Sequence, residues 1–246
     1  AGSGGGGGAG GVDSDGRNGG SGVVVIRYKI GTLQSPGTSP KGATGGAVTI
    51  YSGKVIHTFT SSGTFTAPGP FSETLEYVII GGGGSGGGRN FRGGGGGAGA
   101  VRHGTTPVSG PSTTTVRVGA GGMYFHPEGP NGNGTPSYFG TPITAPGGGH
   151  GGANASSGGN GGSGGGNPGN SADGDSFPGT IGSTPGNGWG HPGGLLAGSG
   201  ASRCGGGGGG AGAAGQNASD PNEGGDGGAG IQLPSTFRNP EFVNPS

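Results

Sequence analysis

Two serines lie in the sequence pattern of a hydrolase nucleophile. Ser85 and Ser163 are each the central residue of a G-x-S-x-G string. Such a serine is catalytic when a sharp strand-to-helix turn exposes its hydroxyl, and no helix-forming sequence follows either one. In a chain with 78 glycines among 246 residues, such strings arise from composition alone. We therefore expect no catalytic residue and no enzyme activity.

Metal and nucleotide sites are not indicated either. The histidines show no ligand spacing and have no Cys or carboxylate pair nearby; they are His57, His103, His126, His150 and His191. The acidic turns at Asp13-Ser-Asp15 and Asp173-Gly-Asp175 lack the later Glu of a full calcium loop, so solvated turns are preferred. Glycine fingerprints for nucleotides lack the helix that would face a phosphate. We expect no metal and no cofactor.

Two glycine-flanked loops carry aromatic and imidazole side chains that could bind a surface. Tyr124, Phe125 and His126 lie in GMYFHPEG, and Trp189 and His191 lie in NGWGHPGG. Rings in such loops could stack on the faces of sugars or on a partner chain. The alternative, which we favour, is that these rings cover neighbouring glycine-rich chain.

The segments that would hold these loops are short strands separated by glycine turns. Runs rich in Val, Ile, Thr, Phe and Tyr, with period-two alternation, predict strands. They cover residues 23–30, 47–51, 54–59, 64–68, 75–80, 100–103, 112–118 and 138–143. A turn is expected around 107–111, and no segment has apolar residues at helical spacing.

One small core is expected between these strands. Its residues are Phe59, Phe65, Phe71, Leu75, Tyr77, Val78, Ile79, Ile80, Val101, Val116, Val118 and Phe139. Such a core is marginal for a chain of this length. Cys204 is alone, so it is expected to be a small filler rather than part of a disulfide.

The remainder of the chain is dominated by glycine clusters, the purest at residues 81–99. Glycine has no side chain to bury, so these clusters are either flexible linkers or are ordered by backbone hydrogen bonds. The polyproline-II conformation has three residues per turn and leaves every N–H and C=O free for neighbouring rods. We predict an all-β fold without helices: a small antiparallel β-sandwich-like core and a bundle of polyglycine-II rods.

Charge excludes two classes of partner. The chain has 11 basic and 11 acidic residues, a net charge of zero, and only 9% charged residues. It therefore offers no electrostatic surface for nucleic acid or an anionic membrane. No run reaches the length of a membrane span.

Similar strings near both ends suggest a repeat. Residues 16–30 and 224–238 each lead from a glycine cluster into an extended segment, and each follows a GGGGGAG block. We interpret 1–31 as the tail of a preceding unit and 32–45 as a linker. Residues 46–233 would be a complete unit, with strands in 47–143 and a glycine-rich bundle in 81–99 and 145–230. Residues 234–246 would be an exit strand or linker.

The string FTSSGTFTAPGPFSETLEYVIIGGGGSGGG, residues 59–88, resembles the glycine-rich domain repeated in tail-fibre and structural proteins of tailed bacteriophages, especially marine T4-like phages. STTTVRVGAGG at 112–122 and GGSGVVVIRYKIG at 19–31 resemble its downstream and closing strands. The resemblance implies glycine-rich rods stacked in polyglycine-II layers, with variable loops at the tip that bind the host.

We therefore expect a structural module of an extracellular or virion fibre, such as a phage tail fibre or appendage. Its partners would be itself, as a trimer or filament, and other fibre or virion proteins. The first alternative is an adhesin whose Tyr124 and Trp189 loops bind a bacterial surface glycan. The second is a glycine-rich ice-binding protein, although the irregular glycine spacing argues against the flat face that such a protein needs.

Overall fold

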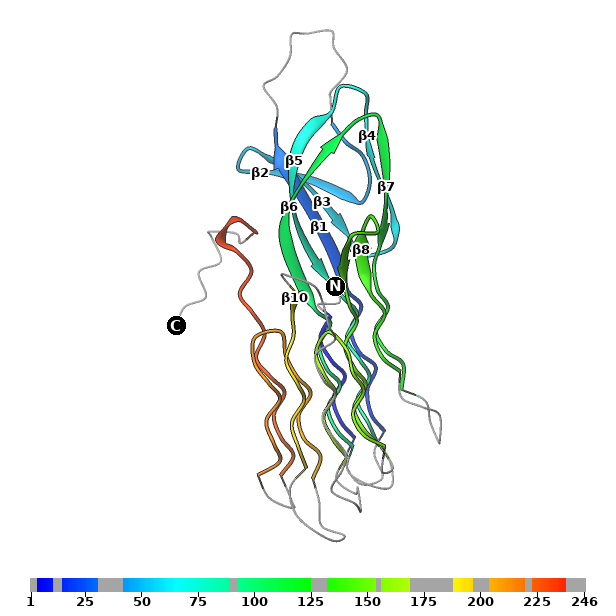
Figure 1. The fold of residues 1–246 in the computed structure, drawn as a ribbon, viewed down its shortest axis with the longest axis vertical. Helices are drawn as coiled ribbons and strands as arrows, with labels where there is room; N and C mark the ends of the chain where they lie inside the picture. The colour runs from blue at the N-terminus through cyan, green and yellow to red at the C-terminus, as the bar shows by residue number, and fades with distance from the viewer. Residues whose placement is uncertain are drawn as a thin grey trace.

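The structure is a computed structural model of an elongated molecule with strands at one end and glycine-rich chain at the other (Figure 1). It describes residues 4–10, 15–30, 42–88, 93–124, 132–153, 156–168, 188–196, 204–219 and 223–237. Within these residues there are two antiparallel sheets, no α-helix, and one short 3-10 helix, η1 (Ser235–Phe237). The prediction of an all-β fold is confirmed.

The larger sheet has six strands. In spatial order they are β10 (Gly188–Trp189), β6 (Val101–Ser109), β5 (Ser72–Ile80), β1 (Val23–Lys29), β3 (Lys54–Phe59) and β2 (Ala47–Tyr51). Strand β1 is central, since Ile26 lies opposite His57 of β3 on one side and Tyr77 of β5 on the other. The segment interpreted as the tail of a preceding unit is thus part of the same sheet as the strands after residue 46.

The smaller sheet has four strands and packs across the first. Its order is β4 (Gly63–Ala67), β7 (Ser112–Arg117), β8 (Ser137–Phe139) and β9 (Ile143–Ala145). The core between the sheets contains Ile26 and Leu75 from the large sheet, and Phe65 and Val116 from the small one. Alternation of apolar and polar residues along these strands places one face of each sheet in this core.

Several strand boundaries differ from the predictions. Strands β2 and β3 have the predicted bounds, but β6 continues through Pro107 to Ser109, so the turn expected at 107–111 is confined to its end. Pro107 is tolerated because it lies far out along β6, opposite Thr74 near the start of β5. The single strand expected at 138–143 is instead a hairpin of β8 and β9, turned at Gly140 with φ +61°.

A second apolar cluster lies on the outer face of the large sheet, so the expected single core was wrong. Val78 and Val101 point away from the inter-sheet core and pack with Ala211, Ile80, Ile231, Leu233 and Phe237. The chain after the last glycine cluster therefore returns to cover the sheet. Residues 235–237, expected within an exit strand or linker, form η1.

An ion-pair network lies beside η1 on this outer face. The Glu76 carboxylate accepts hydrogen bonds from Arg27 Nε at 2.7 Å and Lys54 Nζ at 2.6 Å. The Arg27 guanidinium lies 4.2 Å from the centroid of the Phe237 ring, a cation-π contact. Burial tends to raise the pKa of Glu76, but the hydrogen bonds from Lys54 and Arg27 outweigh it and lower the pKa.

Replacing Glu76 by glutamine is expected to lower the free energy of unfolding by about 1–2 kcal/mol, since Arg27 is nearly buried and loses its counter-charge. Because the folded pKa of Glu76 is lowered, this contribution is present above the unfolded pKa of about 4.3 and is lost as pH falls through the folded value. Urea unfolding at neutral and acidic pH measures it. An equal difference between the two proteins at both pH values would contradict the assignment.

Candidate functional site

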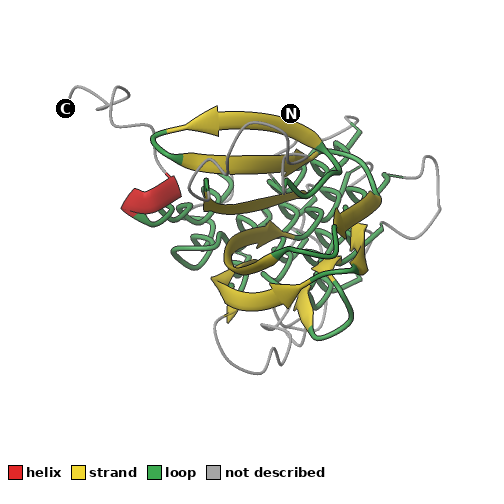
Figure 2. Ribbon diagram, turned by 90° about the horizontal axis from the view of Figure 1, so that it is seen from above, coloured by secondary structure: helices red, strands yellow, loops and turns green. Residues whose placement is uncertain are grey.

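The largest feature outside the sheets is a bundle of glycine-rich segments, which Figure 2 shows nearly end-on beneath the strands. One of its segments, residues 81–88, continues directly from β5 and is called here the central segment. Every residue of the central segment is buried. Since this segment is glycine except for Ser85, backbone contacts must satisfy it.

The N–H groups of the central segment bond in turn to three neighbouring segments. Gly81, Gly84 and Gly87 donate to residues 93–100, at 2.9–3.0 Å. The next positions, Gly82 and Ser85, donate to 132–136, and the third, Gly83 and Gly86, donate to 15–22. The direction of donation therefore repeats every three residues.

The C=O groups of the central segment follow the same period toward three other segments. Gly82 and Ser85 accept from residues 146–152, Gly84 and Gly87 accept from 4–10, and Gly83 accepts from Gly122 in 119–124. The central segment is thus surrounded by six neighbours, three reached by donors and three by acceptors. The bundle also includes residues before 30 and within 119–136, which the predicted bundle of 81–99 and 145–230 did not contain.

These contacts require glycine because the backbones approach too closely for a side chain. A Cβ built on Gly84 would lie 2.1 Å from the Gly149 carbonyl oxygen, and one built on Gly82 would lie 2.0 Å from that of Ala120. Real Cβ atoms do not approach backbone atoms below about 3 Å. Glycine composition is therefore a packing requirement in this bundle.

The two serine motifs belong to the bundle and not to a nucleophile turn. Both side chains are fully buried. The Ser85 hydroxyl oxygen accepts a hydrogen bond from Gly132 N–H at 3.1 Å, and the Ser163 hydroxyl donates to the Gly210 carbonyl at 3.1 Å. Each serine thus replaces one glycine and adds a bond between neighbouring segments.

The candidate recognition residues are not brought together. Tyr124 is half-buried at the end of 119–124, where its N–H donates to Asn18 Oδ1 at 2.8 Å and its hydroxyl to Asp15 Oδ1 at 3.3 Å. The backbone of Trp189 pairs with Val101 in β10, although no strand was expected there. His191 is half-buried, and its carbonyl accepts from Gly164 N–H.

Segments 119–124 and 191–196 lie on opposite sides of the bundle. The central segment, 93–100 and 163–168 bond in sequence between them. Phe125 and His126 lie outside the described residues, as do Asp13, Asp173 and Asp175. The rings expected to act together therefore do not form one described surface.

Two histidines have environments that change their pKa. His57 is fully buried in the core, where its Nδ1–H donates to the Gly45 carbonyl at 2.7 Å and its ring stacks on Tyr28. Burial lowers the pKa of His57, and the Gly45 carbonyl only partly offsets this. Burial also lowers the pKa of His150, whose Nδ1 lies 2.7 Å from Asn133 Oδ1.

Within the described residues, no three His, Cys, Asp or Glu side chains gather as a metal site.

The neutral form of His57 predicts a pH dependence of stability. Its folded pKa is below the unfolded value of about 6.5, so its contribution is present above pH 6.5 and is lost as pH falls through the folded pKa. The variant His57→Gln keeps an N–H donor for Gly45 and should show a flatter decline of melting temperature in this range. Parallel curves of melting temperature against pH for the unmodified protein and His57→Gln would contradict this prediction. Because burial also lowers the pKa of His150, His150→Gln is the second variant to compare in the same pH range.

A known protein family shares the glycine-rich character of the bundle. A family model described as a glycine-rich domain matches residues 60–238, which include most strands and most bundle segments. No curated protein and no solved structure matches the chain. In the part of the chain that the structure describes, no helix has the length and apolar character to cross a membrane.

Proposed function

The chain belongs to the glycine-rich domain family, and we propose that it is a non-enzymatic structural module of an extracellular or virion fibre, such as a phage tail fibre or appendage. The observation that carries the proposal is the three-residue period of hydrogen bonds around the central segment, residues 81–88. A rod with three residues per turn presents its donors and acceptors with this period, so we propose that the segments are polyglycine-II rods.

The mechanical argument follows from where the hydrogen bonds lie. Strands β1 and β5 each continue into the bundle, from residues 15–22 and into 81–88, so the sheet fixes the lateral position of both segments. Bonds between neighbouring segments then resist bending and shear along the long axis. A thin shaft made this way needs few apolar side chains, in keeping with a chain that is only 25% hydrophobic.

Surface charge is also compatible with a passive shaft. The chain has zero net charge, and on the outer sheet face the Glu76 carboxylate pairs with both Arg27 and Lys54. A module of this kind would assemble with copies of itself, as a trimer or filament, or with other fibre proteins.

Assembly and glycan binding separate the proposal from an adhesin. Sedimentation and negative-stain electron microscopy of the full chain over a wide concentration range should show trimers or filaments, and glycan arrays should show no binding. A protein that stays monomeric throughout and binds a bacterial glycan would overturn the structural role. Loss of that binding in Tyr124→Ala, with the melting temperature retained, would identify the adhesin.

A further inference from the structure

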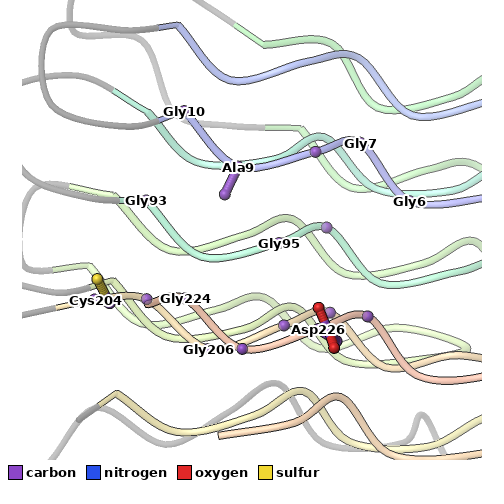
Figure 3. A pocket seen from close by; sticks show the side chains of 17 residues that line it. Gly6, Gly7, Ala9, Gly10, Gly93, Gly95, Cys204, Gly206, Gly224 and Asp226 are labelled. Atoms are coloured by element: carbon purple, nitrogen blue, oxygen red, sulfur yellow. The ribbon is translucent and has the colours of Figure 1, made fainter. Parts of the chain in front are cut away.

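A groove of about 610 Å³ runs along one side of the bundle between four glycine-rich segments (Figure 3). Its lining comes from 6–10, 93–96, 204–208 and 224–227, and all lining residues except Ala9, Cys204 and Asp226 are glycine. The surface of the groove is therefore almost entirely polypeptide backbone.

The groove occupies the place of a missing neighbour beside residues 93–100. That segment donates hydrogen bonds, in a period of three, toward 4–10, 146–152 and 204–210. Its carbonyls accept from 81–88 at Gly94, Gly97 and Ala100, and from 163–168 at Gly95 and Ala98. The third carbonyl row, Gly93 and Gly96, accepts nothing from the described residues, and both glycines line the groove. The central segment has six neighbours, whereas residues 93–100 have five, and the groove lies at the sixth position.

The adjacent segment, 204–210, lacks a partner on the same side. Its N–H groups at 206 and 209 donate to 163–168, and those at 207 and 210 reach Gln216 and Ala213. The remaining row of this segment is Gly205 and Gly208. Both line the groove, and their N–H groups donate to no described residue. A row of acceptors and a row of donors therefore lie side by side on the groove floor.

The two walls continue this alternation. In residues 4–10, the N–H groups of Gly7 and Gly10 are bonded to the central segment, whereas those of Gly6, Gly8 and Ala9, which line the groove, donate to no described residue. In 223–230, Gly225 N–H bonds to Gly205, while the Gly225 carbonyl has no bond within the described residues. Around the groove the order is donor, acceptor, donor, acceptor, which matches the directions that one further rod of three residues per turn presents.

We propose that this groove binds one extended, glycine-rich segment of another polypeptide chain, held by backbone hydrogen bonds. An apolar ligand would leave the N–H groups of Gly205 and Gly208 unsatisfied. A side chain facing the floor would meet backbone at the distances that exclude a Cβ elsewhere in the bundle. The occupant must therefore carry glycine where it faces the floor. The proposal deepens the structural role and rests on its assignment of rod geometry.

The probe is a peptide with the sequence of residues 4–10, GGGGGAG, which recurs at 206–212, with one lysine at each end for solubility. Amide exchange and ¹⁵N chemical shifts of the full chain report its binding. We expect the peptide to shift the Gly205 and Gly208 amides and to slow their exchange about tenfold at saturation. A peptide of equal length with serine in place of glycine should have no effect.

Two leucine variants locate the binding. A Cβ on Gly227 meets only the Gly208 carbonyl oxygen, at 3.8 Å, so Gly227→Leu is accommodated by the bundle while it obstructs the groove. A Cβ on Gly230 meets nothing within 4 Å, and Gly230 is outside the groove. Gly227→Leu should abolish the peptide effect, and Gly230→Leu should retain it.

The amide of Gly84 separates the two possible failures. Slow exchange at Gly84 without any response of Gly205 and Gly208, or an equal response in Gly227→Leu, would overturn the groove proposal alone. Fast exchange at Gly84 would instead show that the bundle is not a set of bonded rods, and the proposed structural role would fail with it.

Discussion

Replacing Gly84 by alanine is expected to lower the free energy of unfolding by about 3 kcal/mol or more, a large effect for one methyl group. The added Cβ would lie 2.1 Å from the Gly149 carbonyl oxygen and 2.4 Å from its carbon. These are backbone atoms, so no rotamer change relieves the overlap. Moving residues 146–152 away would break their bonds to the central segment and to 93–100. Chemical unfolding of the variant measures the effect.

Gly8→Ala is the matched control, because a Cβ built on Gly8 meets no atom within 4 Å. This substitution should leave stability unchanged or raise it by about 0.4–1 kcal/mol, since alanine restricts the unfolded chain. Both variants change one glycine of the same bundle by one methyl group. Equal unfolding free energies for the two would mean that the segments are not packed as the structure places them.

The strands were predictable because their side chains carry the signal. Period-two alternation and β-branched residues gave the bounds of β2 and β3, and Phe65 and Leu75 were correctly expected in the core. The same reasoning missed β1 as a core strand. Val24, Ile26 and Tyr28 were assigned to another unit because a long Pro/Gly-rich stretch separates them from β2. Consecutive strands are usually neighbours in a sheet, but here β1 pairs with β3 and β5 and not with β2.

The outer face of the large sheet was also missed, for a different reason. Strand β5 has the consecutive apolar run Tyr77–Val78–Ile79, with residues on both faces buried, which indicates a strand covered on two sides. Val78 is covered by Ile231, Leu233 and Phe237, which follow the last glycine cluster in the sequence. Such a short apolar stretch near the end of the chain carries no periodicity that would place it there.

The lateral arrangement of the glycine segments could not be predicted at all. Glycine clusters are chemically alike, so no side chain specifies which segment lies beside which. Their arrangement follows from where strands such as β1 and β5 begin and end, together with single markers such as Ser163, which bonds to Gly210. The positions of the candidate recognition residues could not be predicted for the same reason, since Tyr124 and His191 are held in segments whose positions the sequence does not encode.

Amide exchange is expected to follow the three-residue period of the hydrogen bonds, with protection differing by on the order of 10³-fold between neighbouring glycines. Within 204–210, the amides at 206, 207, 209 and 210 are bonded and should exchange slowly, while those of Gly205 and Gly208 should exchange fast. The central segment, whose N–H groups at 81–87 are all bonded, should be protected throughout. Glycine-resolved NMR exchange measures both.

The contrast inside one glycine run is what makes this measurement decisive. Residues 205–210 are identical in sequence and all buried, so neither composition nor simple burial would make Gly208 differ from Gly207. Only the direction in which each N–H points distinguishes them. At a concentration where the chain is monomeric and no peptide is present, uniform slow exchange across the run would refute the three-residue period of the hydrogen bonds. Uniform fast exchange there and in the central segment would show that the glycine clusters are loose spacers, leaving the two sheets as the ordered part of the molecule.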